Sequence, residues 1–87
     1  MSAAISARKF EGLSHRAVPR IRVAFAHRLR GLRRAHGWSQ EGLGARAGLT
    51  GKFLGEVERG EKSISLDGLA HLARALRVPL AAMLQGV

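Results

Sequence analysis

Residues 38–60 read WSQEGLGARAGLTGKFLGEVERG, and this stretch decides the fold. Ser39 is a suitable N-cap for a helix over residues 40–47, because its side-chain oxygen can accept a hydrogen bond from a free N–H of the first turn. A compact turn follows, in which Thr50 can cap a second helix over residues 51–59. The sequence therefore predicts two short helices joined by a tight turn.

The apolar residues of this stretch lie at spacings that give the two helices one continuous inner face. They are Leu43, Ala47, Leu49, Leu54 and Val57. Gly44 has no side chain, which allows the two helices to approach closely where they cross. This geometry lets one helix brace the other while the second enters the major groove of DNA.

Helical periodicity continues on both sides of this pair. A helix is predicted from Pro19 to about His36, with apolar residues at Ile21, Phe25, Leu29 and Leu32. A fourth helix follows a cap at Ser65, with its buried face at Leu66, Leu69, Leu72, Ala73 and Leu76. A short fifth helix runs from Pro79 through Met83 and Leu84. No segment alternates like a half-buried strand, so we predict an all-α, compact five-helix domain over residues 19–87.

Composition narrows the possible functions. The chain has 87 residues, which suits one domain, and no cysteine, which excludes disulfides and thiolate metal sites. Fifteen Lys and Arg against six Asp and Glu give a net charge of +9, and residues 1–46 carry most of it. Such a domain attracts nucleic acid, although a solvated basic surface has the same composition. No apolar run is long enough for a membrane span, so we expect a cytoplasmic, nucleoid-associated protein and no membrane partner.

The chain resembles a known family over residues 25–84. The matching segments are LRGLR (29–33), WSQEGLG (38–44), AGLT (47–50), LGEVERG (54–60), LDGLA (66–70) and LARAL (72–76). Together they resemble the Cro/phage-repressor type of helix-turn-helix protein, the XRE family. Residues 58–66, ERGEKSISL, resemble the controller proteins of restriction–modification systems. The resemblance implies a transcriptional regulator that binds double-stranded DNA, with residues 51–59 as its recognition helix.

Helical spacing predicts which residues of that helix face the DNA. With Leu54 and Val57 turned inward, the outward residues are Gly51, Lys52, Gly55, Glu56 and Arg59. Thr50 and Lys62 flank the helix and can hold phosphates, and the resemblance implies a phosphate contact for Gln40. The two glycines offer no side chain to a base, so part of the specificity is expected to come from DNA shape. Glu56 is repelled by DNA unless it accepts from cytosine or pairs with a nearby basic residue.

The resemblance also implies a mostly buried ion pair between Arg33 and Glu58, whereas the alternative is two independent surface charges. Such a pair has a structural role and contacts no base. Trp38 is expected in the core rather than stacked on a base. Residues 1–18 are expected to form a basic, flexible N-terminal arm. That arm either reaches DNA or makes no contact.

A homodimer is expected, because the C-terminal segment has more apolar residues than one small core needs. The dimer interface is predicted at Leu80, Met83, Leu84 and Val87. The sequence shows no catalytic pattern, and the histidines have no metal-ligand spacing, so we expect neither an enzyme, a metal nor a cofactor. Two alternatives remain: an antitoxin that binds a toxin protein and its own promoter, and an interaction or coactivator module on the same fold.

Overall fold

The computed structural model describes residues 17–87 and shows an all-helical fold. Its elements are α2 (Ala17–Ala35), α3 (Gln40–Ala47), α4 (Gly51–Glu58), α5 (Leu66–Leu76) and the 3₁₀ helix η1 (Leu80–Leu84). Within these residues there is no strand, as the sequence predicts, and no helix is long and apolar enough to cross a membrane. The arm predicted over residues 1–18 lies almost entirely outside the described part of the chain.

Two of the predicted helices differ from the observed ones. The fifth is a 3₁₀ helix and not an α-helix, so residues 17–87 contain four α-helices. Only five residues separate Pro79 from Gln85, and segments this short commonly take the tighter 3₁₀ form. The first described helix begins at Ala17, so Pro19 lies in its first turn, where a missing N–H costs no hydrogen bond.

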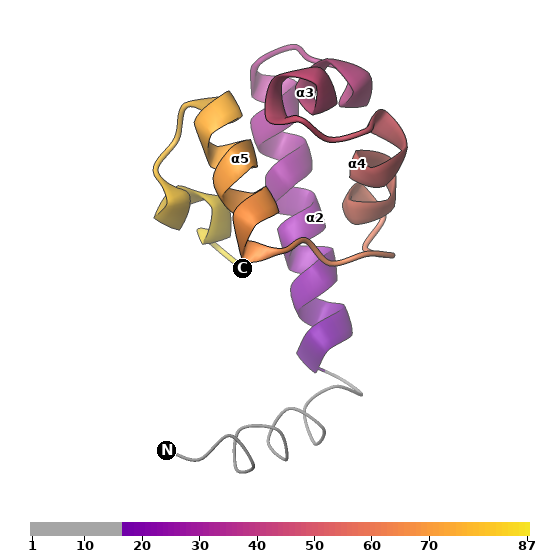
Figure 1. The fold of residues 1–87 in the computed structure, drawn as a ribbon. Helices are drawn as coiled ribbons and strands as arrows, with labels where there is room; N and C mark the ends of the chain where they lie inside the picture. The colour runs from indigo at the N-terminus through magenta and orange to yellow at the C-terminus, as the bar shows by residue number, and fades with distance from the viewer. Residues whose placement is uncertain (1–16) are drawn as a thin grey trace.

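The long helix α2 is the axis of the domain. In Figure 1, α4 and α5 lie on opposite sides of α2, α3 covers the end where α2 finishes, and η1 lies beside α5. The beginning of α2 extends beyond the other helices. Ile21, expected in the core, lies in the first turns of α2 and is 55% exposed. Leu66, also expected in the core, is 72% exposed, because it starts α5 one turn before the buried face of that helix.

Every element contributes at least one fully enclosed side chain to the centre of the core. These residues are Leu29 of α2, Leu43 of α3, Leu54 of α4, Leu72 of α5 and Met83 of η1. The prediction that Met83 lies at a dimer surface is therefore wrong, since its side chain is completely enclosed within its own chain. η1 is also tied to α2 by Arg28, whose Nε donates to the Ala82 carbonyl at 2.9 Å.

The short helices begin at the predicted caps. The hydroxyl oxygens of Ser39, Thr50 and Ser65 accept hydrogen bonds from backbone N–H groups three residues further on, at 2.9–3.0 Å. The turn between α3 and α4 depends on two glycines. Gly48 has a φ of +73°, and a Cβ at Gly44 would collide with the carbonyl oxygen of Leu49. The sequence thus allows α3 and α4 to pack with their backbones nearly in contact.

Candidate nucleic-acid interface

The orientation of α4 is fixed by an ion pair at its last residue. Arg33 of α2 holds the Glu58 carboxylate with two hydrogen bonds, from Nε at 2.7 Å and from Nη2 at 2.9 Å. Glu58 is 2% exposed. A bidentate arginine fixes a carboxylate in both position and direction, so this contact sets the angle between α2 and α4.

Further side chains form hydrogen bonds around Glu58. Arg30, which the sequence reading missed, donates from Nη2 to the Glu58 backbone carbonyl at 2.8 Å. The sequence did contain a signal for this contact. Arg30 lies three residues before Arg33, so both side chains project from the same side of α2. Gln40 donates from Nε2 to Glu58 Oε1 at 3.2 Å. Arg33 Nη1 donates to the Trp38 carbonyl at 2.8 Å, which ties the loop before α3 into the same network.

These contacts keep Glu58 ionised. Burial raises the pKa of Glu58, but the hydrogen bonds from Arg33 and Gln40, together with the nearby guanidinium charges, outweigh burial. The pKa of Glu58 therefore lies below its ordinary value of 4.5. The hydrogen bond to Glu58 raises the pKa of Arg33 in turn. The Arg33–Glu58 pair is therefore charged at neutral pH, and Gln40 extends its network to α3.

The outer face of α4 carries several of the predicted DNA-binding residues. Lys52 is exposed and forms no ion pair within residues 17–87. Thr50 is exposed beside it, although its hydroxyl already accepts from the Phe53 N–H. Gly51 lies against Glu41 of α3, because a Cβ at Gly51 would meet Glu41 Cγ at 2.8 Å. Glu56 is half-buried.

Gly55 is buried, unlike the groove-facing position that helical spacing predicts. The reason is that two long side chains lie across it. A Cβ at Gly55 would be 3.1 Å from Arg59 Nη1 and 3.1 Å from Gln40 Oε1. The absence of a side chain at Gly55 thus leaves room for both Gln40 and Arg59 over the middle of α4.

Arg59 is exposed and has a partner that the sequence reading did not anticipate. Its Nε donates to Glu61 Oε2 at 2.9 Å, and Nη2 donates to the other carboxylate oxygen at 3.3 Å. The hydrogen bond lowers the pKa of Glu61 and raises that of Arg59. Lys62 is also exposed and lines a small hollow with Ile21 and Leu84. The pairing of Arg59 with Glu61 reduces the free positive charge beside α4.

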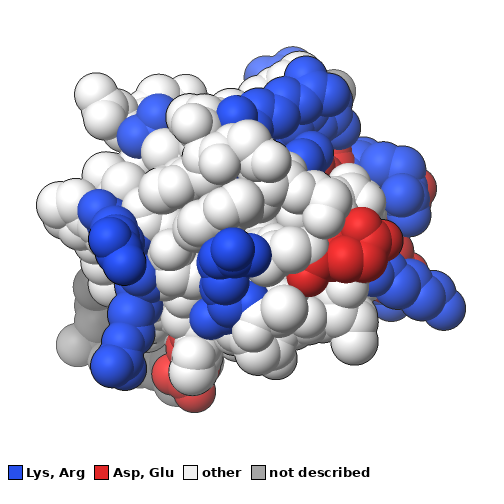
Figure 2. Space-filling model, turned by 90° about the horizontal axis from the view of Figure 1, so that it is seen from above, with Lys and Arg blue, Asp and Glu red and all other residues white. Residues whose placement is uncertain are grey.

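The positive charge of the domain extends well beyond α4. Seen from above, the face in Figure 2 carries several separate groups of Lys and Arg, whereas Asp and Glu form only small patches. No group of three or more His, Cys, Asp or Glu with the geometry of a metal site occurs in the part of the chain that the structure describes. This surface is suited to polyanions.

Comparison with known proteins relates this geometry to a family. A helix-turn-helix domain family matches residues 24–84. The restriction-modification controller protein C.AhdI from Aeromonas hydrophila is 39% identical with a TM-score of 0.74, and the match covers 77% of this chain and 97% of C.AhdI. An HTH_3 family transcriptional regulator from Vibrio cholerae is 27% identical with a TM-score of 0.73; 77% of this chain but 38% of the regulator is covered.

A hypothetical transcription factor from Neisseria, NHTF, is 34% identical with a TM-score of 0.70, and the match covers 74% of this chain and 72% of NHTF. None of the curated proteins matches. The family match spans α3, the turn and α4, where the structure shows the close helix pair. The chain therefore belongs to the XRE-type helix-turn-helix family of DNA-binding transcription regulators.

Proposed function

We propose that this protein is a sequence-specific transcription regulator that binds double-stranded DNA as a homodimer, with α4 in the major groove. The observation that carries the proposal is the geometry of α4. Its inner face and last residue are held by the core and by the buried Arg33–Glu58 pair. Lys52 and Arg59 remain exposed on the outside. A rigid helix with exposed basic side chains is what base readout in the major groove requires.

Under this proposal, some residues around α4 contact DNA bases and others contact phosphates. Lys52 and Arg59 are the candidates for hydrogen bonds to guanine O6 and N7. Thr50 and Lys62 flank the helix, and Gln40 lies at the start of α3, where exposed N–H groups and the helix dipole favour a phosphate. The buried Gly55 reads no base by itself, which supports a contribution from DNA shape.

The homodimer is supported by apolar side chains at the C-terminal end. Leu80, Leu84 and Val87 are each more than 40% exposed. Leu84 and Ile21 line one hollow of about 160 Å³. Arg22 lines the same hollow, and its Nε is buried without a hydrogen-bond partner in the described chain. A second copy that covers this surface would bury the apolar groups. Binding of both copies to a two-fold DNA site requires their α4 helices to lie about 34 Å apart, one DNA turn.

The similarity to C.AhdI supports a narrower role. That protein is named a restriction-modification controller, and the match covers nearly all of it. We therefore propose control of restriction–modification genes as the physiological task. This role places the protein in the cytoplasm, bound to the nucleoid.

The first test is selection of bound DNA from a randomised duplex library at near-physiological salt. We expect enrichment of a palindromic site, lost in the double variant Lys52→Ala/Arg59→Ala. Salt-sensitive binding without any enriched sequence would contradict the proposal and favour an interaction or coactivator module. Copurification of the protein with a toxin would instead favour an antitoxin.

The dimer requires a separate measurement. Leu84→Glu introduces a charge into the proposed interface and is expected to give monomers in sedimentation equilibrium. Val23→Glu is the matched control, because Val23 is 49% exposed and does not line that hollow. A wild-type protein that stays monomeric on its DNA site would contradict the homodimer and leave DNA binding itself intact.

A further inference from the structure

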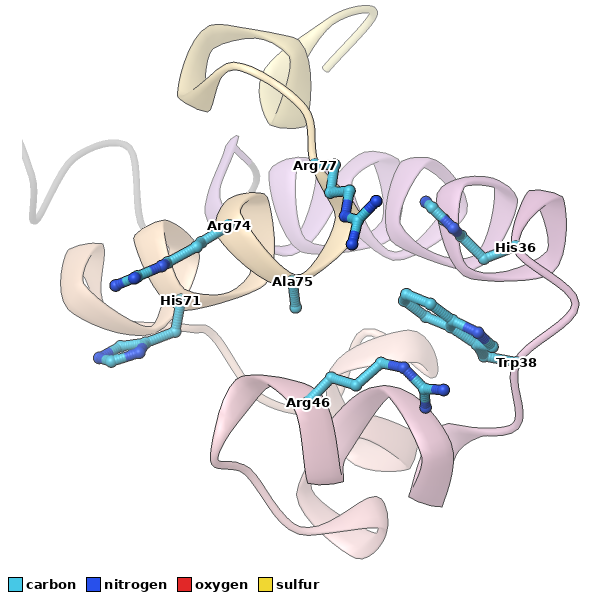
Figure 3. A pocket seen from close by; sticks show the side chains of 7 residues that line it. All are labelled: His36, Trp38, Arg46, His71, Arg74, Ala75 and Arg77. Atoms are coloured by element: carbon cyan, nitrogen blue, oxygen red, sulfur yellow. The ribbon is translucent and has the colours of Figure 1, made fainter.

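A second basic surface lies away from the outer face of α4. A cleft of about 680 Å³ opens between α3, α5 and the end of α2. Its lining includes His36, Trp38, Arg46, His71, Arg74 and Arg77 (Figure 3). In Figure 1, α5 lies on the opposite side of α2 from α4.

All charged side chains that line the cleft are basic. Arg46, Arg74 and Arg77 form no ion pair with a carboxylate of residues 17–87. Like charges gathered along a concave wall repel one another and focus a positive potential into the space between them. An anion bound in the cleft would relieve this repulsion.

One wall of the cleft is already ordered. The Arg46 guanidinium lies 4.1 Å from the centre of the Trp38 ring, and its Nη1 donates to the Gly42 carbonyl at 2.9 Å. His36 stacks on Trp38 with ring centres 4.2 Å apart, and a hydrogen bond of 2.9 Å joins its Nε2 to the Leu76 carbonyl. Because these side chains hold one another, a ligand would meet a preformed charge.

Arg77 supplies an independent observation. It follows α5 with a φ of +58°, and it is the one residue other than glycine with a positive φ between residues 17 and 87. Glycine is the usual residue at this position, because a Cβ makes the left-handed conformation costly. The chain keeps a strained arginine there, and this side chain lines the cleft.

We propose that this cleft binds a small molecule that carries two or more phosphate groups. Guanidinium groups match phosphate oxygens in charge and in paired hydrogen bonds. Three arginines line this cleft: Arg46 and Arg77 lie near Trp38, and Arg74 lies toward His71 (Figure 3), so a chain of phosphates could extend from one end to the other. Trp38 lies between His36 and Arg46 in Figure 3, so little of its ring is left for a nucleobase. The phosphate chain therefore supplies the recognition. It belongs either to an inorganic polyphosphate or to a nucleoside polyphosphate.

The chain contains its own reporter for this site. Trp38 is the single tryptophan, so a ligand that contacts Arg46 should change the only tryptophan fluorescence of the protein. The experiment titrates inorganic tripolyphosphate into the full chain at constant, near-physiological ionic strength and follows this emission. Calorimetry with tripolyphosphate and with ATP gives the stoichiometry. Equal affinity for the two identifies the phosphate chain as the ligand, whereas tighter binding of ATP identifies the nucleoside form.

Variants separate the cleft from the DNA-binding surface. The double variant Arg74→Ala/Arg77→Gly removes two cleft charges and relieves the strain at residue 77, and we expect it to weaken tripolyphosphate binding roughly tenfold or more. Arg77→Gly alone is expected to fold at least as well as the wild type and to weaken binding by a smaller factor. Lys52→Ala is the control, because it removes a charge from α4 and should leave this binding unchanged.

Three results would overturn the proposal. They are no binding of either ligand, equal weakening by Arg77→Gly and Lys52→Ala, and a stoichiometry well above one ligand per chain. Each would mean that the arginines act only as diffuse surface charge. The test uses no operator DNA, so its outcome is independent of the proposed regulatory function.

Discussion

At the C-terminal end of α4, the Arg33–Glu58 and Arg59–Glu61 pairs differ in burial rather than in chemistry. In both, Arg Nε donates to a carboxylate oxygen, at 2.7 Å for Arg33–Glu58 and 2.9 Å for Arg59–Glu61. The side chains of the first pair are 12% and 1% exposed, whereas those of the second are 55% and 53% exposed. Water and salt screen the second pair but hardly reach the first.

The comparison shows how consecutive residues can serve different purposes. Glu58 points into the domain and joins α4 to α2, so its loss would leave a buried guanidinium without a counter-charge. Arg59 points outward, and its exposed partner can be replaced by another anion at little cost. We therefore propose that Glu58 orients α4 and that Arg59 contacts DNA. The following predictions test that division.

The largest effect is expected from Glu58→Ala. Breaking a buried pair typically costs about 3–5 kcal/mol, because the remaining charge has no partner. The free energy of unfolding, measured by urea denaturation, should fall by an amount in this range. The double variant Arg33→Met/Glu58→Leu should lose less stability than Glu58→Ala, since it leaves no buried charge unpaired. Arg30, which also lies 3.6 Å from the Glu58 carboxylate, is 35% exposed and stays in contact with water. An equal loss for Glu58→Ala and Glu61→Ala would show that burial does not separate the two pairs.

The next effect concerns DNA affinity. Arg59→Ala should weaken binding to the selected operator by roughly tenfold, as expected for one good base contact. Its thermal midpoint should stay that of the wild type, because Arg59 is exposed and contributes little to the core. The measurement is a fluorescence-anisotropy titration beside a thermal melt. If Arg59→Ala lowers the midpoint as much as Glu58→Ala does, Arg59 is structural and its assignment to DNA fails.

The pH dependence of stability gives another way to compare the buried Glu58 with the exposed Glu61. A carboxylate whose pKa is lowered on folding stabilises the folded state above its unfolded pKa. For Glu58, this stabilisation is present at neutral pH and is lost as the pH falls below 4.5 and through the folded pKa. Urea denaturation at a series of acidic pH values should therefore show a shallower decline in Glu58→Gln than in the wild type. Glu61→Gln should keep nearly the wild-type decline, and the opposite ranking would refute the burial argument.

The sequence predicted the parts of the fold that follow from local chemistry. Ser39, Thr50 and Ser65 predicted the starts of three helices, since an N-cap bond joins residues three positions apart. Gly44 indicated the close approach of α3 and α4 for a similarly local reason. The family of DNA-binding regulators followed from the spacing of several such segments taken together.

Other features depend on which element covers a residue, and periodicity does not contain that information. Met83 and Leu84 are adjacent and both apolar, yet Met83 is enclosed and Leu84 is 49% exposed. Ile21 belongs to the apolar stripe of α2 but lines an open hollow near the start of that helix and is 55% exposed. Gly55 faces outward by helical spacing and is covered by side chains from two other positions. These outcomes required the three-dimensional arrangement.

The smallest effect is expected from Glu61→Gln. This change removes the partner of Arg59 and one negative charge beside α4. The thermal midpoint should not change measurably, because an exposed pair is screened by solvent. Affinity for the operator at low salt should rise by about threefold at most and return to the wild-type value as salt screens the charge. A fall in affinity at every salt concentration would show instead that Glu61 holds Arg59 in its DNA-binding position. In that case the exposed pair, like the buried one, would act by orienting an arginine.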